Sequence, residues 1–241
     1  MNWYPGPDSE PRIWYEPDEI ETIAEDELKR AGVTPTLKDP VTDLEPLIEV
    51  HLKAKLDQYA ELSPDVLGVT HFQTRQRINI SINRTLTEAA EESPPRPGAV
   101  GRWRATMAHE ASHVILHRYL FDPILADTIV SGADVKKPEY DRLMRCLTGN
   151  VVPEKSENWN RTRSTRDWRE VQANMSMAAL LMPRRLFSRI AHQKIDELML
   201  TGLTKGSPSS SVLCSALSDI FRVSKQASSI RLESLAIISV P

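Results

Sequence analysis

The chain is poor in cysteine, in long apolar runs and in net charge, and each shortage excludes a class of protein. Its 241 residues include two cysteines, too few for a disulfide framework and not spaced as in a structural zinc site. No apolar stretch approaches the ~18 to 20 residues that span a membrane, and the N-terminus lacks the basic start and apolar run of a secretory signal. A formal net charge of -3 is unlike that of a dedicated nucleic-acid-binding protein. We therefore expect a soluble intracellular protein that does not bind nucleic acid directly.

The charge that is present is unevenly placed. Residues 1–50 carry 13 acidic and 4 basic residues, whereas the rest of the chain is net basic. Such a segment forms a solvated acidic helix face, or it contacts the basic remainder or a basic partner. Hydrophobic residues make up 40% of the chain, which is enough for a core, and 241 residues correspond to one or two domains.

Residue periodicity divides the chain into three parts. Residues 1–17 contain four prolines and four Trp or Tyr residues, so we expect an extended arm without regular structure that packs its aromatic side chains on the body. Apolar spacing predicts helices at about 18–31, 43–59, 106–119, 165–181, 212–221 and 224–235. Alternating or β-branched runs predict strands at 66–70 and 77–83, and residues 205–211 are typical of a flexible joint. We expect an α+β protein with parts at 1–17, 18–203 and 204–241.

The residues that indicate chemistry are His109-Glu110-Ala111-Ser112-His113. On a helix, positions four apart lie one turn apart on the same face, so both imidazoles can reach one ion. The carboxylate of Glu110 is rotated away from that ion and can take a proton from a water that the ion activates. Two histidines and an adjacent carboxylate are the arrangement that metal-assisted hydrolysis requires.

A catalytic zinc usually has a third protein ligand, and two residues compete for that role. His117 continues the four-residue series, but each step rotates about 40° and rises ~6 Å, so its ring lies past an ion between His109 and His113. It is therefore interpreted as a structural histidine or one that supports a ligand. Glu170 is the better candidate, because Asn174 follows it one helical turn later and can orient a ligand histidine.

The two motifs together resemble a known family. HEASHVILH at 109–117 and EVQANMSMAALLMP at 170–183 are similar to HELGHxLLH and ExxANxFAAxLLMP of the ImmA/IrrE metallopeptidases. PVTDLEPLIE, VLGVTHF, RINISIN, RWRATMAHE and LSDIFRVSKQASSIRLESLAII also resemble that family, so the likeness covers roughly residues 18–240. Ser112 replaces the usual glycine, and Met175-Ser176-Met177 displaces the usual aromatic residue. Neither departure removes a ligand or the base.

The resemblance implies a zincin-like α+β fold with a small mixed sheet, an active-site helix and a C-terminal segment like a helix-turn-helix. It implies one zinc per chain held by His109, His113 and Glu170, with Glu110 as general base and Asn174 as a residue that supports a ligand. The ligand set prefers zinc, and manganese is an alternative. The implied function is cytoplasmic, regulated cleavage of a helix-turn-helix repressor.

Several alternatives stay open. An oxyanion donor could come from Tyr140, His192 or the arginines at 161, 163, 166 and 169. The alternating strand at 78–82 could be an edge that pairs with substrate, and the two cysteines are interpreted as inert buried thiols. The C-terminal helices could belong to a DNA-binding regulator, although their net charge is only +1 from Ser209 onward. The protein could also be a metal-binding module without catalysis, which the intact Glu110 argues against.

Overall fold

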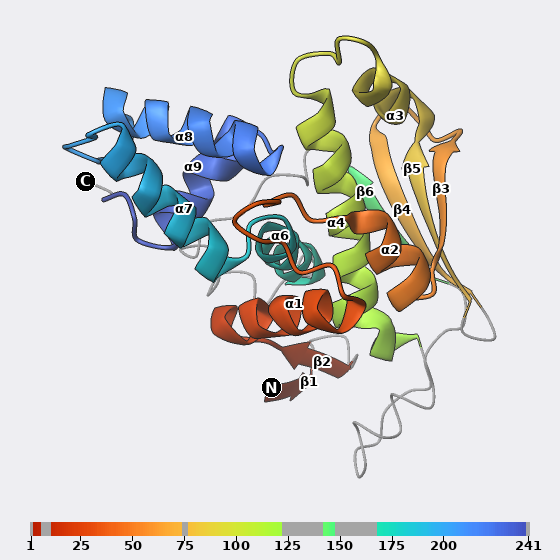
Figure 1. Cartoon of the computed structure of the whole chain (residues 1–241). Coiled ribbons are helices and arrows are strands. Elements are labelled where there is room, and N and C mark those ends of the chain that lie inside the picture. Colours follow the sequence, from red (N-terminus) through yellow and green to blue (C-terminus); the bar gives the residue numbers. More distant parts are fainter. Residues whose placement is uncertain (1, 6–10, 74–76, 122–141, 148–167, 240–241) are drawn as a thin grey trace.

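A computed structural model describes residues 2–5, 11–73, 77–121, 142–147 and 168–239, and it confirms a mixed α+β architecture (Figure 1). The strands are β1 Asn2–Pro5, β2 Pro11–Trp14, β3 Lys55–Ala60, β4 Val66–Phe72, β5 Ile78–Asn83 and β6 Arg142–Leu147. The principal helices are α1 Pro17–Ala31, α3 Arg84–Glu91, α4 Ala99–His117, α6 Trp168–Leu181, α7 Arg184–Glu197, α8 Pro208–Phe221 and α9 Lys225–Ser234. Within these ranges, no helix is both long and apolar enough to cross a membrane.

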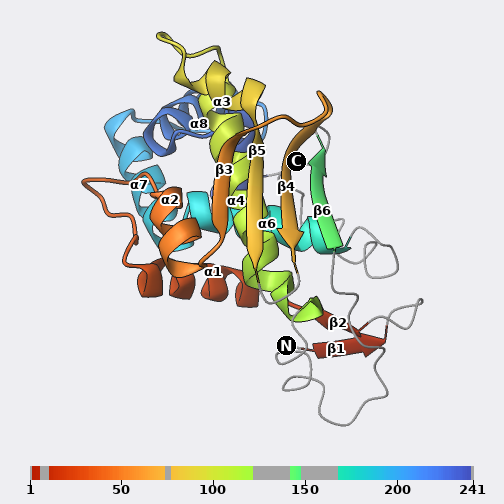
Figure 2. The same cartoon turned by 90° about the vertical axis from the view of Figure 1, so that its right-hand side faces the viewer.

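Among the described residues, four strands form the main sheet, in the order β3-β5-β4-β6 (Figure 2). Strand β3 runs parallel to β5, and the β5–β4 and β4–β6 pairs are antiparallel, so the sheet is mixed. The predicted strands at 66–70 and 77–83 correspond to β4 and β5. Strand β5 lies between two neighbours, so the hypothesis that it is an edge strand pairing with substrate is wrong: its backbone hydrogen-bonding groups are already used on both sides.

Helix α4 is the central element, and layers pack on both of its sides. It contacts β4, β5 and β6 of the sheet, and it also contacts α6, which in turn packs on α1 (Figure 1). The α4 side chains are buried almost all round, including Met107, Ala108, Ala111 and Val114. A helix enclosed in this way holds its polar side chains in a fixed, water-poor position.

The single helix predicted at 43–59 is wrong. The structure has α2 Leu44–Pro46, a π-helical turn at Leu47–His51 and then strand β3. Lys53 adopts a left-handed backbone with φ of 56°, which ends the helical turns. Strand β3 then pairs with β5, and its side chains alternate between exposed and half-buried. The apolar spacing fits a helix, but strand pairing, a long-range interaction, determines the conformation.

The N-terminal arm contains regular structure, contrary to the prediction. Strands β1 and β2 form an antiparallel hairpin, with Pro5 and Pro11 paired at the end where the two strands are connected. Proline is tolerated there because a terminal pair needs fewer backbone donors. Ile13, Trp14 and Tyr15 are buried with Leu116, Tyr119, Trp168 and Val171 in a cluster of their own. The expectation that aromatic residues of the arm pack on the body is confirmed for Trp14 and Tyr15.

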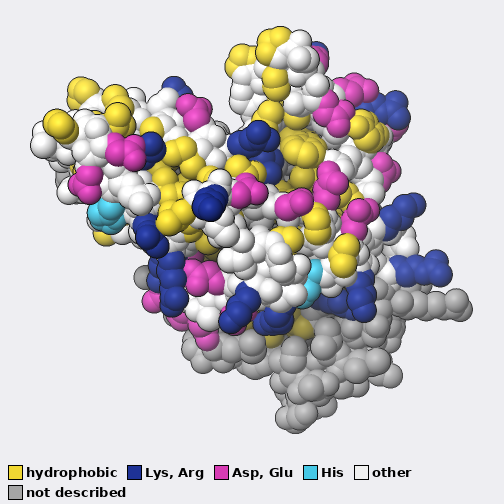
Figure 3. Space-filling view, in the orientation of Figure 1, with side chains coloured by type: hydrophobic (Ala, Val, Ile, Leu, Met, Phe, Trp, Pro, Cys, Tyr) yellow, Lys and Arg dark blue, Asp and Glu magenta, His cyan; other side chains and the backbone are white. Residues whose placement is uncertain are grey.

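The C-terminal segment is helical, as predicted. The flexible joint predicted at 205–211 is wrong, because residues 208–211 form the first turn of α8. Ser207 caps α8 by accepting a hydrogen bond from the Ser210 backbone, Pro208 occupies the first turn, and Ser209–Ser211 are helical. Helices α3 and α7 were not predicted from the sequence. A cavity of 620 Å³ lies between α3, α4 and the α8–α9 turn, at the notch visible in Figure 3.

Gly101 of α4 allows the α8–α9 turn to approach the helix closely. A Cβ built on Gly101 would lie 2.9 Å from the backbone N of Ser224 and 3.0 Å from the backbone C of Val223. Replacing glycine by alanine inside a helix normally raises the free energy of unfolding by about 1 kcal/mol. We expect Gly101→Ala to lower the free energy of unfolding by about 1–3 kcal/mol instead, because the backbone of the turn must move. Urea unfolding measures this loss, and a Gly101→Ala protein as stable as the wild type would contradict the close contact.

Candidate metal centre

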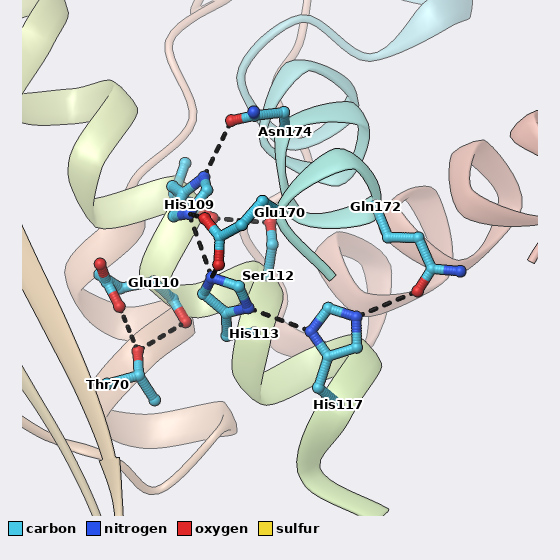
Figure 4. Close-up of polar contacts among 10 residues, drawn as sticks. Thr70, His109, Glu110, Ser112, His113, His117, Glu170, Gln172 and Asn174 are labelled. Atoms are coloured by element: carbon cyan, nitrogen blue, oxygen red, sulfur yellow. Dashed lines mark hydrogen bonds and ion pairs between the residues drawn. The ribbon is translucent and has the colours of Figure 1, made fainter. Parts of the chain in front are cut away.

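Three residues predicted from the helical spacing meet on α4. His109, Glu110 and His113 are each fully buried. Helix α6 crosses α4 and presents Glu170 from its first turn and Asn174 from the next turn (Figure 4). The side chain of Glu170 is 24% exposed, so the cluster has one side that solvent reaches. The structure thus brings together residues 61 positions apart, as the sequence motifs predicted.

The donor atoms of this cluster converge on a small space. Nε2 of His109 lies 3.1 Å from Nε2 of His113 and 3.2 Å from Oε2 of Glu170. Nε2 of His113 lies 3.4 Å from Oε1 of Glu170. Two ligands bound at 2.0–2.1 Å to a tetrahedral zinc would lie roughly 3.3 Å apart. The cluster of His109, His113 and Glu170 therefore has the size of a metal site.

Hydrogen bonds on the far side of each ring direct the Nε2 lone pairs inward. Nδ1 of His109 lies 3.0 Å from Oδ1 of Asn174, an amide oxygen that only accepts, so Nδ1 carries the proton. Nδ1 of His113 lies 3.0 Å from Nδ1 of His117. His117 in turn contacts Oε1 of Gln172 through Nε2 at 3.0 Å, which leaves its Nδ1 as an acceptor for His113. Lone pairs of two imidazoles and a carboxylate thus face one another, and a cation between them would satisfy all three groups.

The charges around His109 favour a positive charge at this position. Burial alone lowers the pKa of His109, but the hydrogen bond to Glu170 and the carboxylate charges of Glu110 and Glu170 outweigh it and raise the pKa. Burial and the neighbouring His109 lower the pKa of His113 well below its usual value. Because a metal ligand must be an unprotonated imidazole, the low pKa of His113 suits a ligand.

Glu110 is held beside the cluster by the sheet. Thr70 of β4 donates a hydrogen bond of 2.5 Å to Oε2, while Oε1 is buried and has no hydrogen-bond partner in the described part of the chain. Gly68 makes room for it, because a Cβ there would lie 2.8 Å from Oε1. Burial, reinforced by the charge of Glu170, raises the pKa of Glu110 to about 7. With one oxygen held by Thr70, the other oxygen of this carboxylate is left to accept and return a proton.

Thr70, Gln172 and Cys146 contribute to the site and were missed as site residues. Period two along β4 places Gly68 and Thr70 on one face of the strand, but the sequence does not say that this face meets α4. Cys146 is fully buried, as expected, and its thiol offers a sulfur within 4.8 Å of donor atoms of His109 and Glu110. Burial raises the pKa of that thiol far above its usual range. The neutral thiol is then a small apolar side chain beside Glu110.

His117 lies where the helical geometry predicted. It is fully buried, contacts His113 rather than Glu170, and its ring packs edge-on against Trp168 at 5.4 Å. Among the oxyanion candidates, His192 is exposed and bonds to the Ser188 carbonyl, and the Arg169 guanidinium lies 5.7 Å from the ring centre of Trp168. Tyr140, Arg161, Arg163 and Arg166 lie outside the described residues.

Comparisons of the chain with protein-family models, with curated proteins and with solved structures found no match. The arrangement itself is what the structure supports: an HExxH-like helix whose two histidines, with Glu170, could hold a metal ion.

Proposed function

We propose that this protein is a zinc-dependent endopeptidase of the ImmA/IrrE type. The observation that supports the proposal best is the convergence of His109, His113 and Glu170, with Glu110 beside them and hydrogen-bonded to Thr70. A protein that only bound a metal would have no need of a buried carboxylate beside the ligands. Two imidazoles and one carboxylate are a common ligand set of catalytic zinc.

Each residue has a defined task in this proposal. A divalent ion held by His109, His113 and Glu170 would supply the Lewis acidity that activates a water and polarises a substrate carbonyl. Glu110 accepts the proton of that water at Oε1 and later returns it to the leaving amine. Thr70 holds the other oxygen of the carboxylate, and Asn174 fixes the ring of His109. Glu170, partly exposed, borders the side from which substrate and metal enter.

The substrate proposal is a helix-turn-helix transcriptional repressor, cleaved in the cytoplasm. It rests on the resemblance of 109–117 and 170–183 to the ImmA/IrrE motifs, together with the site geometry that those motifs require. In the same proposal, residues 18–203 form the peptidase domain and residues 204–241 a helical subdomain packed on it.

Metal analysis of Glu170→Ala tests the ligand set. We expect about one zinc per wild-type chain by mass spectrometry, since three protein ligands complete such a site. Glu170→Ala should lose most of that zinc on dialysis. The matched control is Glu92→Ala, an exposed glutamate outside the cluster, which should keep it. Zinc retained by Glu170→Ala, or manganese bound in preference to zinc, would contradict the proposed ligand set or metal.

A DNA-binding role for α8 and α9 is the second candidate, and the contacts of these helices favour it less. Of the basic residues from Ser209 onward, Arg231 is buried and bonded to Glu21 of α1. Arg222 and Lys225 remain, while Asp219 and Glu233 oppose them in charge. Binding of nucleic-acid phosphates requires several basic residues along one face, and this pair of helices carries few of them.

A further inference from the structure

A chain of hydrogen bonds joins the metal cluster to the N-terminal arm. His113 contacts His117 at 3.0 Å, and His117 contacts Oε1 of Gln172 at 3.0 Å (Figure 4). The amide nitrogen of Gln172 then donates to the backbone carbonyl of Ile13 in β2, at 3.2 Å. The backbone N–H of Ile13 donates to the hydroxyl of Tyr119 at 2.9 Å. These hydrogen bonds thus connect α4, α6 and β2, and they end at Tyr119, which follows α4 in the sequence.

Only one arrangement of protons satisfies the chain from end to end. The carbonyl of Ile13 can only accept, so Gln172 must present its NH₂ group there and its oxygen to His117. His117 therefore donates from Nε2 and accepts at Nδ1, and His113 donates from its own Nδ1. This leaves the Nε2 lone pair of His113 aimed at Glu170 and His109, which is the form that binds a metal.

The chain of hydrogen bonds is enclosed by protein, so water cannot readily replace any of its donors or acceptors. His117, Gln172 and Ile13 are fully buried, and Tyr119 is 5% exposed. Ile13, Tyr119 and Trp168 belong to the apolar cluster beneath the arm, and Trp168 also packs against the ring of His117. An unpaired donor or acceptor in such surroundings costs about 1–3 kcal/mol, so each link holds the next one in place.

We propose that strand β2 contributes to metal binding by fixing the tautomer of His113. Gln172 and His117 are the positioning residues that connect β2 to His113. Ile13 selects the amide orientation of Gln172, Gln172 selects the tautomer of His117, and His117 fixes both the tautomer and the ring plane of His113. The inference rests on the proposed metal binding and adds to it a contribution from the N-terminal arm.

The coupling acts in both directions. If the ordered arm favours the metal-binding form of His113, metal binding must stabilise the arm by the same free energy. Zinc should therefore slow hydrogen exchange at the backbone amide of Ile13, which lies outside the ligand set and bonds to Tyr119. In this proposal, a change that displaces β2 from α6 also changes the affinity for the metal.

The test measures zinc affinity by competition with a chromophoric chelator. In His117→Phe the ring still packs on Trp168, but His113 loses its acceptor and can place its proton on Nε2. We expect this variant to bind zinc about 10–100-fold more weakly, as for other residues that support metal ligands. Gln172→Leu should weaken zinc binding in the same direction, and the double variant should show less than the product of the two effects. Zinc should also protect the Ile13 amide in the wild type and not in Gln172→Leu.

Leu116→Ala is the matched control, because Leu116 is 1% exposed on the same helix and packs in the same cluster without joining the chain. It should lower stability and leave zinc affinity unchanged. Zinc affinity within twofold of the wild type in both His117→Phe and Gln172→Leu would overturn the inference, as would an equal loss in Leu116→Ala. A wild-type protein that binds no zinc would overturn the proposed function instead, so the two failures are distinguishable.

Discussion

Replacing Glu110 by glutamine is expected to slow peptide hydrolysis by about 10²–10⁴-fold while zinc stays bound. The amide has nearly the shape of the carboxylate and still accepts the hydrogen bond from Thr70, so the fold and the three ligands are retained. What is lost is the base, because a glutamine cannot take a proton from water. The measurement is the initial rate of cleavage of a pool of internally quenched peptides, with zinc content determined on the same samples.

Glu88→Gln on α3 is the control for removing one carboxylate charge, because Glu88 lies outside the cluster. It should cleave the peptide pool at the wild-type rate. A Glu110→Gln protein that holds one zinc and cleaves as fast as the wild type would rule out Glu110 as the base. A wild-type protein that holds zinc and cleaves no peptide in the pool, and no helix-turn-helix repressor, would favour a metal-binding module without catalysis.

The sequence predicts the cluster well because its constraints are local. Four-residue spacing on a helix fixes that His109 and His113 share a face, whatever surrounds them. The same rule places Asn174 one turn after Glu170. It also places His117 beyond the ligands, where the structure has it in contact with His113. The pairing of the two helices followed from the need for a third ligand, and the resemblance supported it.

The missed features depend on contacts between distant segments. Residues 55–60 form a strand because β5 is available as a partner, although their own spacing fits a helix. Thr70 becomes a site residue only when β4 packs on α4, and Gln172 only when β2 folds back on α6. The residue periodicity of one segment does not predict which face of another segment it will pack against.

Helix α6 connects the metal site with the C-terminal helices. Its first turn carries Glu170, and the residue after its last turn, Met182, is bonded to Arg231 of α9. Nε of Arg231 donates to the Met182 carbonyl at 3.0 Å and Nη2 donates to it at 2.8 Å. A cation at this end of a helix also complements the helix dipole. Arg231 of α9 therefore holds the C-terminal end of α6, whereas Glu170 lies at the opposite end of that helix.

Arg231→Met is expected to lower the free energy of unfolding by about 3 kcal/mol, the lower end of the range for breaking a buried ion pair. Arg231 is 4% exposed and forms a two-pronged ion pair with Glu21 of α1, whose side chain is 13% exposed. After the substitution, the one ion pair left to Glu21 within the described ranges is the longer contact of 3.9 Å to Arg184, and the Met182 carbonyl loses both Arg231 donors. Urea unfolding of the metal-free protein measures the loss without a contribution from bound zinc.

The double variant Glu21→Leu/Arg231→Met separates the unpaired charge from the lost helix cap. It removes both charges, so it should recover part of the stability that Arg231→Met loses, while the cost of leaving the Met182 carbonyl without donors remains. Zinc affinity of the folded single variant should stay near that of the wild type, because the ligands lie at the opposite end of α6. A single variant that loses less than about 1 kcal/mol would show that the ion pair contributes no more than a surface pair. A double variant as unstable as the single one would assign the loss to the carbonyl of Met182 rather than to Glu21.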